Sequence, residues 1–329
     1  LVIGGGFTGL WTAYHLKSSE PDLEVGLVES HRIGHGPSGR NGGFVDAMWV
    51  SFASLVKRYG DQPALALARA SERSVHQVGE FLEEHGVDAW YRLSGYLNVS
   101  TAPAWDGSWT ENVQAMRAAG VLDGPRELTP AQVQEICASP AFRGGVHYGA
   151  AATVQPARLA FGIREANQVL GVQMFESSPV VRVEDGGSEA TVFTPAGRIR
   201  AGRLVMANGP ALAGAGSPLR SNVTLASSHM VITEPVPDVI DQLGWTGGEA
   251  ISDCRSLLTY FRTTPDGRIA FGWGGGRIAA GGRRFGRAEH DADVVAGVIA
   301  GLRRYFPMLA DRQIEYAWGG PIDASATHL

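Results

Sequence analysis

The stretch LVIGGGFTGLWTAYHLKSSEPDLEVGLVES, residues 1–30, decides the fold of this chain. A short apolar run leads into the motif G-x-G-x-x-G, formed by Gly4, Gly6 and Gly9. Apolar side chains then recur at helical spacing over residues 10–16, and a second apolar run over residues 25–28 ends at an acid. This order predicts strand, tight turn, helix and strand, the first unit of a dinucleotide-binding α/β fold.

Each part of the motif has a physical task in that fold. Gly4 permits the tight turn, Gly6 lets the backbone approach a pyrophosphate, and Gly9 lets the helix pack close to the strand. The free N–H groups at the start of the helix, at Phe7 and Thr8, are expected to face the phosphates. The alternative is a glycine turn with a purely structural role.

Glu29 ends the second predicted strand, twenty residues after Gly9. A carboxylate at this distance accepts the hydroxyls of an adenosine ribose. It also repels a ribose 2′-phosphate, so NADP is disfavoured. We include the next two residues, Ser30 and His31, among the expected cofactor-binding residues.

Length and composition restrict the class of protein. A chain of 329 residues suggests about two domains, and 44% apolar with 19% charged residues is typical of a soluble globular protein. A net charge of −5 predicts no nucleic-acid partner. The two cysteines are too few for a disulfide framework and favour a cytoplasmic location.

The sequence shows neither a transmembrane run nor a signal peptide. No run approaches the roughly 20 apolar residues of a transmembrane helix, and the N-terminus lacks a signal-peptide pattern. Because the chain begins without Met and inside its first predicted strand, we expect both ends to be trimmed.

Hydrophobic spacing along the rest of the chain predicts both helices and strands. Thr129, before Pro130, is the expected N-cap of a helix. The expected elements are a loop over residues 30–44, helices over 52–86, a strand pair over 90–100, helical structure over 109–138, strands over 204–207, 223–234 and 256–273, a glycine- and arginine-rich loop over 272–287, and a helix over 291–305. This uneven alternation suggests an α/β nucleotide domain interrupted by an α+β insertion.

Further segments indicate which dinucleotide is bound. An NAD dehydrogenase follows its ribose acid with more βαβ units, whereas this chain continues with a glycine-rich second loop. The segments GHGPSGRNGG, ATVQPARLA, LVMANG, TEPV, YFRTTPDGRIAFG and AWGGPID stand in the order found in the D-amino-acid-oxidase-like superfamily of FAD amine oxidoreductases. The chain resembles this superfamily over nearly its whole length, and the γ-glutamylputrescine oxidase-like branch in particular. The resemblance implies FAD as the cofactor.

The resemblance also implies a discontinuous architecture. An α/β FAD-binding Rossmann-like domain would comprise residues 1–60, 145–225 and 315–329. An inserted α+β substrate domain with an antiparallel sheet would comprise residues 61–144 and 226–314. Members of the superfamily carry one more glycine-rich segment near the C-terminus, and this chain stops before such a motif, which again suggests truncation.

The second loop is expected to run along the pyrophosphate toward the flavin. Its expected cofactor contacts are Ser38, Gly39, Arg40, Asn41, Gly42 and Gly43. Arg40 is also a catalytic candidate, because a nearby cation stabilises the negative charge of a reduced flavin. Some distant relatives attach the flavin covalently through a histidine at about this position, which an arginine cannot do, so we expect non-covalent FAD. The alternative is an ordinary surface loop.

Two further segments are expected at the cofactor. Relatives hold the adenine edge with the backbone of a valine such as Val180, although a strand residue in the core explains this position equally well. Ala207, Asn208 and Gly209 end a predicted strand at the sheet edge where ligands of open α/β sheets bind.

Tyr260, Arg262 and Trp318 are the expected substrate residues. Tyr260 and Arg262 alternate on a predicted strand, so both side chains point to one face. The resemblance puts this strand over the flavin, where the two residues can bind a substrate carboxylate or another polar group. The alternatives are an exposed strand face with a salt-bridged arginine and a packing tryptophan. The nine histidines show no metal-ligand spacing, so no metal is expected.

The main functional hypothesis is oxidation of a C–N bond in a small amine or amino acid. Hydride transfer to flavin N5 would give an imine that hydrolyses, and oxygen, a quinone or another electron carrier would accept the electrons. The alternatives are an FAD dehydrogenase of a hydroxy acid or polyol phosphate, and a flavoprotein without turnover.

Overall fold

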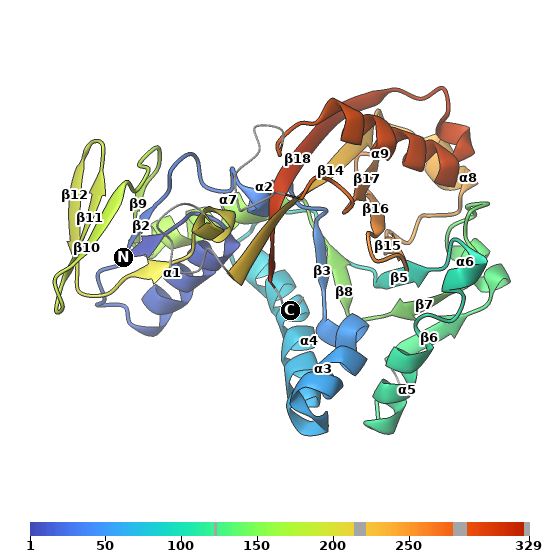
Figure 1. The fold of residues 1–329 in the computed structure, drawn as a ribbon, viewed down its shortest axis with the longest axis horizontal. Coiled ribbons are helices and arrows are strands. Elements are labelled where there is room, and N and C mark those ends of the chain that lie inside the picture. Colours follow the sequence, from blue (N-terminus) through green and yellow to red (C-terminus); the bar gives the residue numbers. More distant parts are fainter. Residues whose placement is uncertain (122–123, 214–221, 279–287, 326–329) are drawn as a thin grey trace.

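The computed structural model describes residues 1–121, 124–213, 222–278 and 288–325. Figure 1 shows a smaller lobe, which holds the N-terminus, and a larger lobe built on a wide sheet. The long strands β14 (Val223–Thr233) and β18 (Ile314–Ser325) run at the border between the two.

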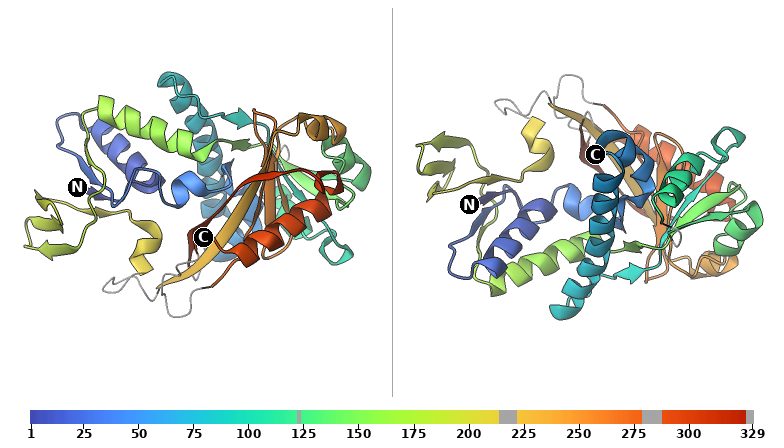
Figure 2. Two further views of the ribbon diagram at one scale, coloured as in Figure 1. Left: turned by 90° about the horizontal axis from the view of Figure 1, so that it is seen from above. Right: turned by 90° about the horizontal axis from the view of Figure 1, so that it is seen from below.

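The smaller lobe contains a parallel sheet in the order β13-β1-β2-β9. Its strands are β1 (Val2–Ile3), β2 (Gly26–Val28), β9 (Gln173–Phe175) and β13 (Val205–Met206). Helices α1 (Phe7–Ser19) and α7 (Pro156–Val169) lie side by side against this sheet, as Figure 2 shows. Such crossover connections are what parallel strands require. An antiparallel meander of β10 (Arg182–Asp185), β11 (Ala190–Thr194) and β12 (Gly197–Ala201) extends from it.

The larger lobe is built on a sheet in the order β18-β14-β17-β16-β15-β5-β7-β6. All neighbours are antiparallel except β15 and β5. The strands not yet given are β5 (Tyr96–Val99), β6 (Pro125–Leu128), β7 (Gly145–Tyr148), β15 (Ala250–Asp253), β16 (Thr259–Thr263) and β17 (Ile269–Trp273).

One face of the large sheet is an apolar core. Phe261, Phe271 and Val231 are fully buried there, against α9 (Ala292–Tyr305) and α8 (Pro237–Gln242). Because side chains alternate along a strand, the next residues in sequence point to the opposite face. This opposite face, which we call the site face, carries a row of cross-strand neighbours: Asn98, Ser252, Tyr260, Gly272, Met230 and Trp318.

A three-stranded sheet in the order β3-β8-β4 lies between the two lobes. Its strands are β3 (Phe44–Asp46), β8 (Ala151–Thr153) and β4 (Arg92–Leu93). The remaining helices are α2 (Pro37–Arg40), α3 (Phe52–Tyr59), α4 (Asp61–Glu84), α5 (Thr110–Ala118) and α6 (Pro130–Ile136), with 3-10 turns at Met48–Ser51, Pro103–Trp105, Gly209–Ala213 and Pro307–Leu309.

The predicted fold class is confirmed: a parallel Rossmann-like sheet is combined with a mostly antiparallel substrate-domain sheet. The predicted N-cap is also confirmed, since Thr129 and Gln132 form a capping box at the start of α6. The residue ranges of the two domains stay a prediction; β7 and β18, which fall in the predicted FAD segments, pair within the large sheet.

Three local predictions were wrong. The expected helical run over residues 109–138 is broken by β6, because its residues pair with β7 at the sheet edge. The expected loop over residues 30–44 contains the short helix α2. The strand pair over residues 90–100 consists of β4 and β5, which belong to different sheets.

Parts of four predicted segments fall outside the described residues. They are 122–123 of the helical structure over 109–138, 214–221 of the FAD-domain range 145–225, 279–287 of the glycine- and arginine-rich loop, and 326–329 of the last FAD-domain range. In the part of the chain that the structure describes, no helix has both the length and the apolar character needed to cross a membrane.

Candidate functional site

The glycine turn joins β1 to α1 with very little space. Gly4 has φ of +116°, and a Cβ on it would lie 2.3 Å from the carbonyl oxygen of Ala207. A Cβ on Gly9 would lie 1.9 Å from the carbonyl oxygen of Gly4. Both distances are well inside van der Waals contact, so the strand–turn–helix geometry requires glycine at both positions. The start of α1 is therefore held directly beside the end of the parallel sheet.

The second predicted cofactor loop packs against this helix start. The Phe7 N–H donates to Ser38 Oγ over 2.9 Å, and Asn41 holds the loop in shape by accepting from the Gly43 N–H at 2.8 Å and donating to the Ser38 carbonyl at 2.8 Å. Thr8, in the first turn of α1, is exposed. Two segments 31 residues apart in sequence thus form one surface of small residues and backbone N–H groups.

Glu29 lies beside the glycine turn. One carboxylate oxygen accepts from the Gly5 N–H at 2.7 Å, and the other accepts from the His31 N–H and the Ser30 hydroxyl, both at 2.9 Å. Its own backbone carbonyl accepts from the Ser178 N–H at 2.8 Å. This last bond brings the segment that contains Val180 next to Glu29. Val180 itself lies between β9 and β10 rather than in a strand, which corrects its description as a strand residue.

The end of β13 faces the glycine turn from the other side. The Ala207 N–H donates to the Ile3 carbonyl at 2.8 Å, and Gly209 has φ of +47°. Asn208 Oδ1 is buried and accepts no hydrogen bond from the described residues. A buried acceptor without a donor is costly, so this atom indicates a place where a ligand donor belongs.

Arg40 and Trp318 meet at the outer end of the loop. The Trp318 indole N–H donates to the Arg40 backbone carbonyl at 2.8 Å. The Arg40 guanidinium lies 3.4 Å from Glu289 Oε1 and 3.0 Å from His35 Nε2. Burial and the Arg40 charge lower the pKa of His35, so this histidine is neutral and can accept. Trp318 therefore contacts the backbone of Arg40, and the arginine side chain is already paired.

Tyr260 and Arg262 both project from the site face onto the loop, as their alternation predicts. The ring of Tyr260 fills the space beside Gly42, where a Cβ would lie 2.9 Å from the ring. Its hydroxyl donates to Ser228 Oγ at 2.7 Å, and Ser228 donates to the Trp273 carbonyl at 2.9 Å. Burial raises the pKa of Tyr260, so the phenol is neutral. The tyrosine ring and the loop are in direct contact.

Arg262 has contacts that differ from the expected ones. It is 6% exposed, its Nε donates to the Gly42 carbonyl at 2.7 Å, and Nη1 donates to the Thr263 carbonyl at 3.3 Å. Burial lowers the pKa of the guanidinium to about 10. These bonds hold the loop, so a contact with a substrate carboxylate stays a prediction, available only to the remaining N–H groups.

The family follows from a comparison with known proteins. The model of the DAO family, described as FAD dependent oxidoreductase, matches residues 1–329. The chain belongs to this family. It is 28% identical to the probable oxidoreductase OrdL of Rhizobium meliloti (strain 1021), over 98% of this chain and 72% of the relative. It is also 28% identical to gamma-glutamylputrescine oxidoreductase of Escherichia coli (strain K12), over 97% of this chain and 72% of the relative.

A solved structure supports the fold of this DAO-family chain. Glycine oxidase from Bacillus cereus ATCC 14579 superposes with a TM-score of 0.78 at 18% identity, over 98% of this chain and 82% of that one. The match to the family model confirms the predicted membership of the D-amino-acid-oxidase-like superfamily.

The residues of the turn, the loop and the two strand ends fit the FAD of a DAO-family protein. The helix start of α1 offers N–H groups to a pyrophosphate, although the Phe7 N–H, expected to be free, is bonded to Ser38 Oγ. Glu29 offers a carboxylate to a ribose, and Asn208 offers an unmatched buried acceptor. In the described part of the chain, no group of three or more His, Cys, Asp or Glu side chains could hold a metal ion.

Glu29→Ala is expected to weaken FAD binding by about 1–3 kcal/mol, because charged hydrogen bonds are lost. Two quantities are compared between wild type and variant. They are the flavin retained after dialysis and the FAD dissociation constant measured by flavin fluorescence. Glu24→Ala, an exposed acid in the preceding loop, is the matched control. Equal retention in wild type and Glu29→Ala would remove the ribose role from Glu29.

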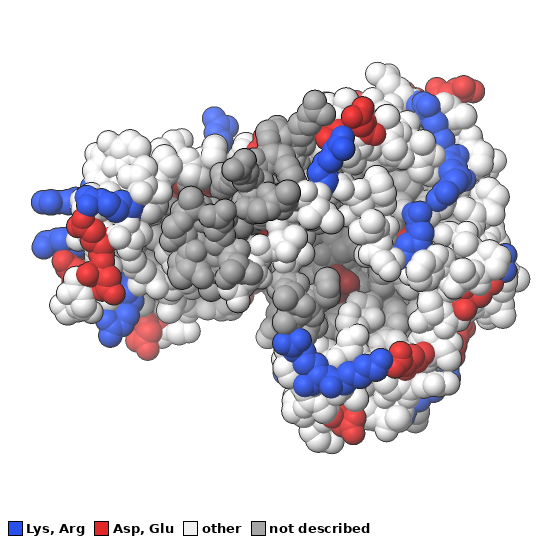
Figure 3. Space-filling view, in the orientation of Figure 1, with Lys and Arg blue, Asp and Glu red and all other residues white. Residues whose placement is uncertain are grey.

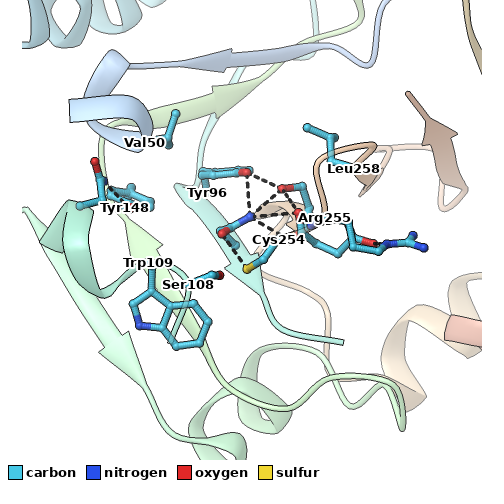
Figure 4. Close-up of a pocket in the computed structure, with 12 residues that line it drawn as sticks. Val50, Tyr96, Ser108, Trp109, Tyr148, Cys254, Arg255 and Leu258 are labelled. Atoms are coloured by element: carbon cyan, nitrogen blue, oxygen red, sulfur yellow. Dashed lines mark hydrogen bonds and ion pairs between the residues drawn. The ribbon is translucent and has the colours of Figure 1, made fainter. Parts of the chain in front are cut away.

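The sequence reasoning missed a polar cavity on the site face, of about 250 Å³. Tyr96, Asn98 and Ser252 line it from β5 and β15, and Tyr148, Trp109 and Cys254 lie around them (Figure 4). The alternation of polar and apolar residues at Tyr96-Leu97-Asn98-Val99 was the available signal, since it predicts a strand with one polar face. What that face lines depends on its neighbours in the sheet.

Proposed function

We propose that this DAO-family protein oxidises a C–N bond of an amine or amino acid, using non-covalent FAD. FAD, when bound, supplies the two-electron oxidation of the carbon beside the substrate nitrogen. The imine so formed hydrolyses to a carbonyl compound and an amine or ammonia. The name of the Escherichia coli relative indicates an amine substrate for that protein, which supports an amine here and the γ-glutamylputrescine oxidase-like branch.

The observation that carries the proposal is the contact between the cofactor loop and β16. Tyr260 packs on Gly42 and Arg262 donates to the Gly42 carbonyl, so the site face closes directly over the loop expected to hold the flavin. A substrate bound beside this contact would lie between the flavin and the site face, against the neutral phenol of Tyr260. Holding the substrate in one orientation against the flavin provides much of the rate enhancement. No dedicated base is needed if the amine binds in its neutral form.

The side chains at this contact have separate roles in the proposed reaction. Tyr260, held by Ser228, orients the substrate and excludes water. Arg262 and Trp318 position the loop through its backbone carbonyls. Arg40 places positive charge near the loop, where it stabilises negative charge that develops during oxidation.

An anaerobic flavin-bleaching screen tests the function. FAD-loaded protein is mixed with polyamines, γ-glutamylated amines, N-methyl amino acids and D-amino acids, and the absorbance near roughly 450 nm is followed. Hydroxy acids and polyol phosphates serve as the competing class. We expect at least one amine to bleach the flavin at a saturating rate and no hydroxy acid to do so.

Two outcomes would contradict the proposal. If only a hydroxy acid or polyol phosphate bleached the flavin, the protein would be an FAD dehydrogenase of that class of alcohol. Failure of every compound to reduce a flavin that dithionite does reduce would indicate a flavoprotein without turnover on these substrates. Readmitting air, or adding a quinone, to the bleached protein then identifies the electron acceptor.

A further inference from the structure

Asp46 is an acid that the proposed cofactor site does not use. It ends β3, four residues after Gly42, and its side chain is exposed. Burial by the surrounding protein nevertheless raises its pKa. Asp46 pairs with Ala151 of β8, whose carbonyl accepts from the N–H of Gly95 at 2.8 Å, the residue before Tyr96. No Lys, Arg or His among the described residues lies within ion-pair distance of it. Figure 3 shows the molecule in the orientation of Figure 1. It has a hollow between helix α3 and the large sheet, with acidic atoms at its floor.

Aromatic rings lie on the same face of β3 as Asp46. Its face of β3 also carries Phe44, whose ring meets Tyr96 edge-on at 6.2 Å and Tyr260 at 6.0 Å between centroids. Tyr148 stacks on Tyr96 at 6.1 Å. Burial raises the pKa of Tyr96, and the charge of Asp46 adds to this effect. A carboxylate beside several aromatic faces is the combination that attracts an organic cation.

The cavity next to these rings is lined by neutral hydrogen-bonding groups. Asn98 donates to Ser252 Oγ at 3.0 Å and accepts from Cys254 Sγ at 3.0 Å. Burial raises the pKa of Tyr148 to about 12 and that of Cys254 to about 11, so both are uncharged near pH 7.

The charged residues along this cavity are already matched. Asp253 accepts from the Arg255 Nε at 2.6 Å and from the Tyr305 hydroxyl at 2.5 Å, and in Figure 4 the Arg255 guanidinium points away from the cavity. Among the described residues near Tyr96, Asp46 is thus the charged side chain that has no ion-pair partner.

We propose that Asp46 and the cavity bind a second, cationic group of the substrate, an alkylammonium, while the reacting amine lies beside Tyr260. The inference rests on the proposed function and narrows its substrate class to diamines or longer polyamines. Asp46 comes two positions after Phe44, which is roughly 7 Å along a strand. Several methylene groups between the two nitrogens span this distance. Phe44 and Tyr96 then cover the alkyl chain, and the phenols and amides bind the second ammonium with Asp46.

The test uses a matched pair of ligands, pentane-1,5-diamine and n-pentylamine. Their binding to FAD-loaded, dithionite-reduced protein is measured anaerobically by calorimetry, because the reduced protein cannot turn them over. We expect the diamine to bind about tenfold or more tightly, since a partly desolvated charge pair is gained. Asp46→Asn should abolish this difference, and Asp22→Asn, an exposed acid in the smaller lobe, should keep it. In the oxidised protein, kcat/KM for the diamine should fall by about tenfold in Asp46→Asn.

Equal affinity of wild-type protein for the two amines would overturn the inference without any variant. So would a preference for the diamine that survives Asp46→Asn at normal flavin content. Asp46-dependent binding without flavin reduction by any amine would contradict the proposed function and leave the cation site standing. Flavin reduction by monoamines and diamines at equal efficiency would contradict the cation site and leave the proposed function standing.

Discussion

Gly6→Val should abolish FAD incorporation while the protein still folds. A Cβ at Gly6 would lie 2.8 Å from Ser38 Oγ, the atom that accepts the Phe7 N–H. The valine side chain therefore displaces the second loop from the helix start and occupies the space that a pyrophosphate needs. The measurement is flavin content after purification and after reconstitution with excess FAD, with circular dichroism to report folding.

Gly197→Val is the matched control for this prediction. Gly197 lies in β12, and a Cβ there meets no atom within 4 Å. It should therefore incorporate FAD normally. Gly9→Ala should fail differently, by losing the fold, because its Cβ would strike the Gly4 carbonyl and no rotation can relieve a backbone clash. A fully flavinated Gly6→Val protein would show that FAD does not bind at this turn.

Arg262→Met should weaken the hold of β16 on the loop. If the remaining N–H groups of Arg262 bind substrate, the substitution should also raise the activation free energy behind kcat/KM for flavin reduction by about 2–4 kcal/mol, the cost of truncating one partner of a buried charged contact. The Gly42 carbonyl then loses its donor in a buried position, which costs about 1–3 kcal/mol. Arg262→Lys should restore part of the loss, because a single ammonium cannot reproduce the donors on both Nε and Nη1. Rates of anaerobic reduction are compared at matched flavin content.

The melting temperature separates the two possible roles of Arg262. If the residue holds the loop, Arg262→Met should melt earlier and release FAD more readily, with a smaller defect in reduction once flavin content is matched. If it binds substrate, the defect should lie mainly in kcat/KM and the melting temperature should change little. Identical melting and identical rates in wild type, Met and Lys variants would contradict both.

The parts of the site that sequence reasoning predicted are those built from short stretches of chain. Gly4, Gly9 and Glu29 act within one strand–turn–helix–strand unit, whose geometry follows from backbone sterics and residue spacing. Tyr260 and Arg262 were placed on one face because alternation along a strand is a local property. The helical prediction over residues 109–138 was wrong because apolar spacing cannot register that β6 gains its hydrogen bonds from β7.

By itself the sequence determined the dinucleotide-binding turn, the family and the fold class, since these depend on local conformation and on ordered motifs along the chain. The tertiary structure decided which distant residues meet. Trp318 reaches the carbonyl of Arg40 across 278 residues, and Arg262 turns to Gly42 rather than outward. Asp46 pairs with Ala151, which in turn bonds to Gly95, the residue before Tyr96. Such contacts depend on the order in which strands pair and on which groups are buried away from water. The spacing of residues along one strand determines neither of these.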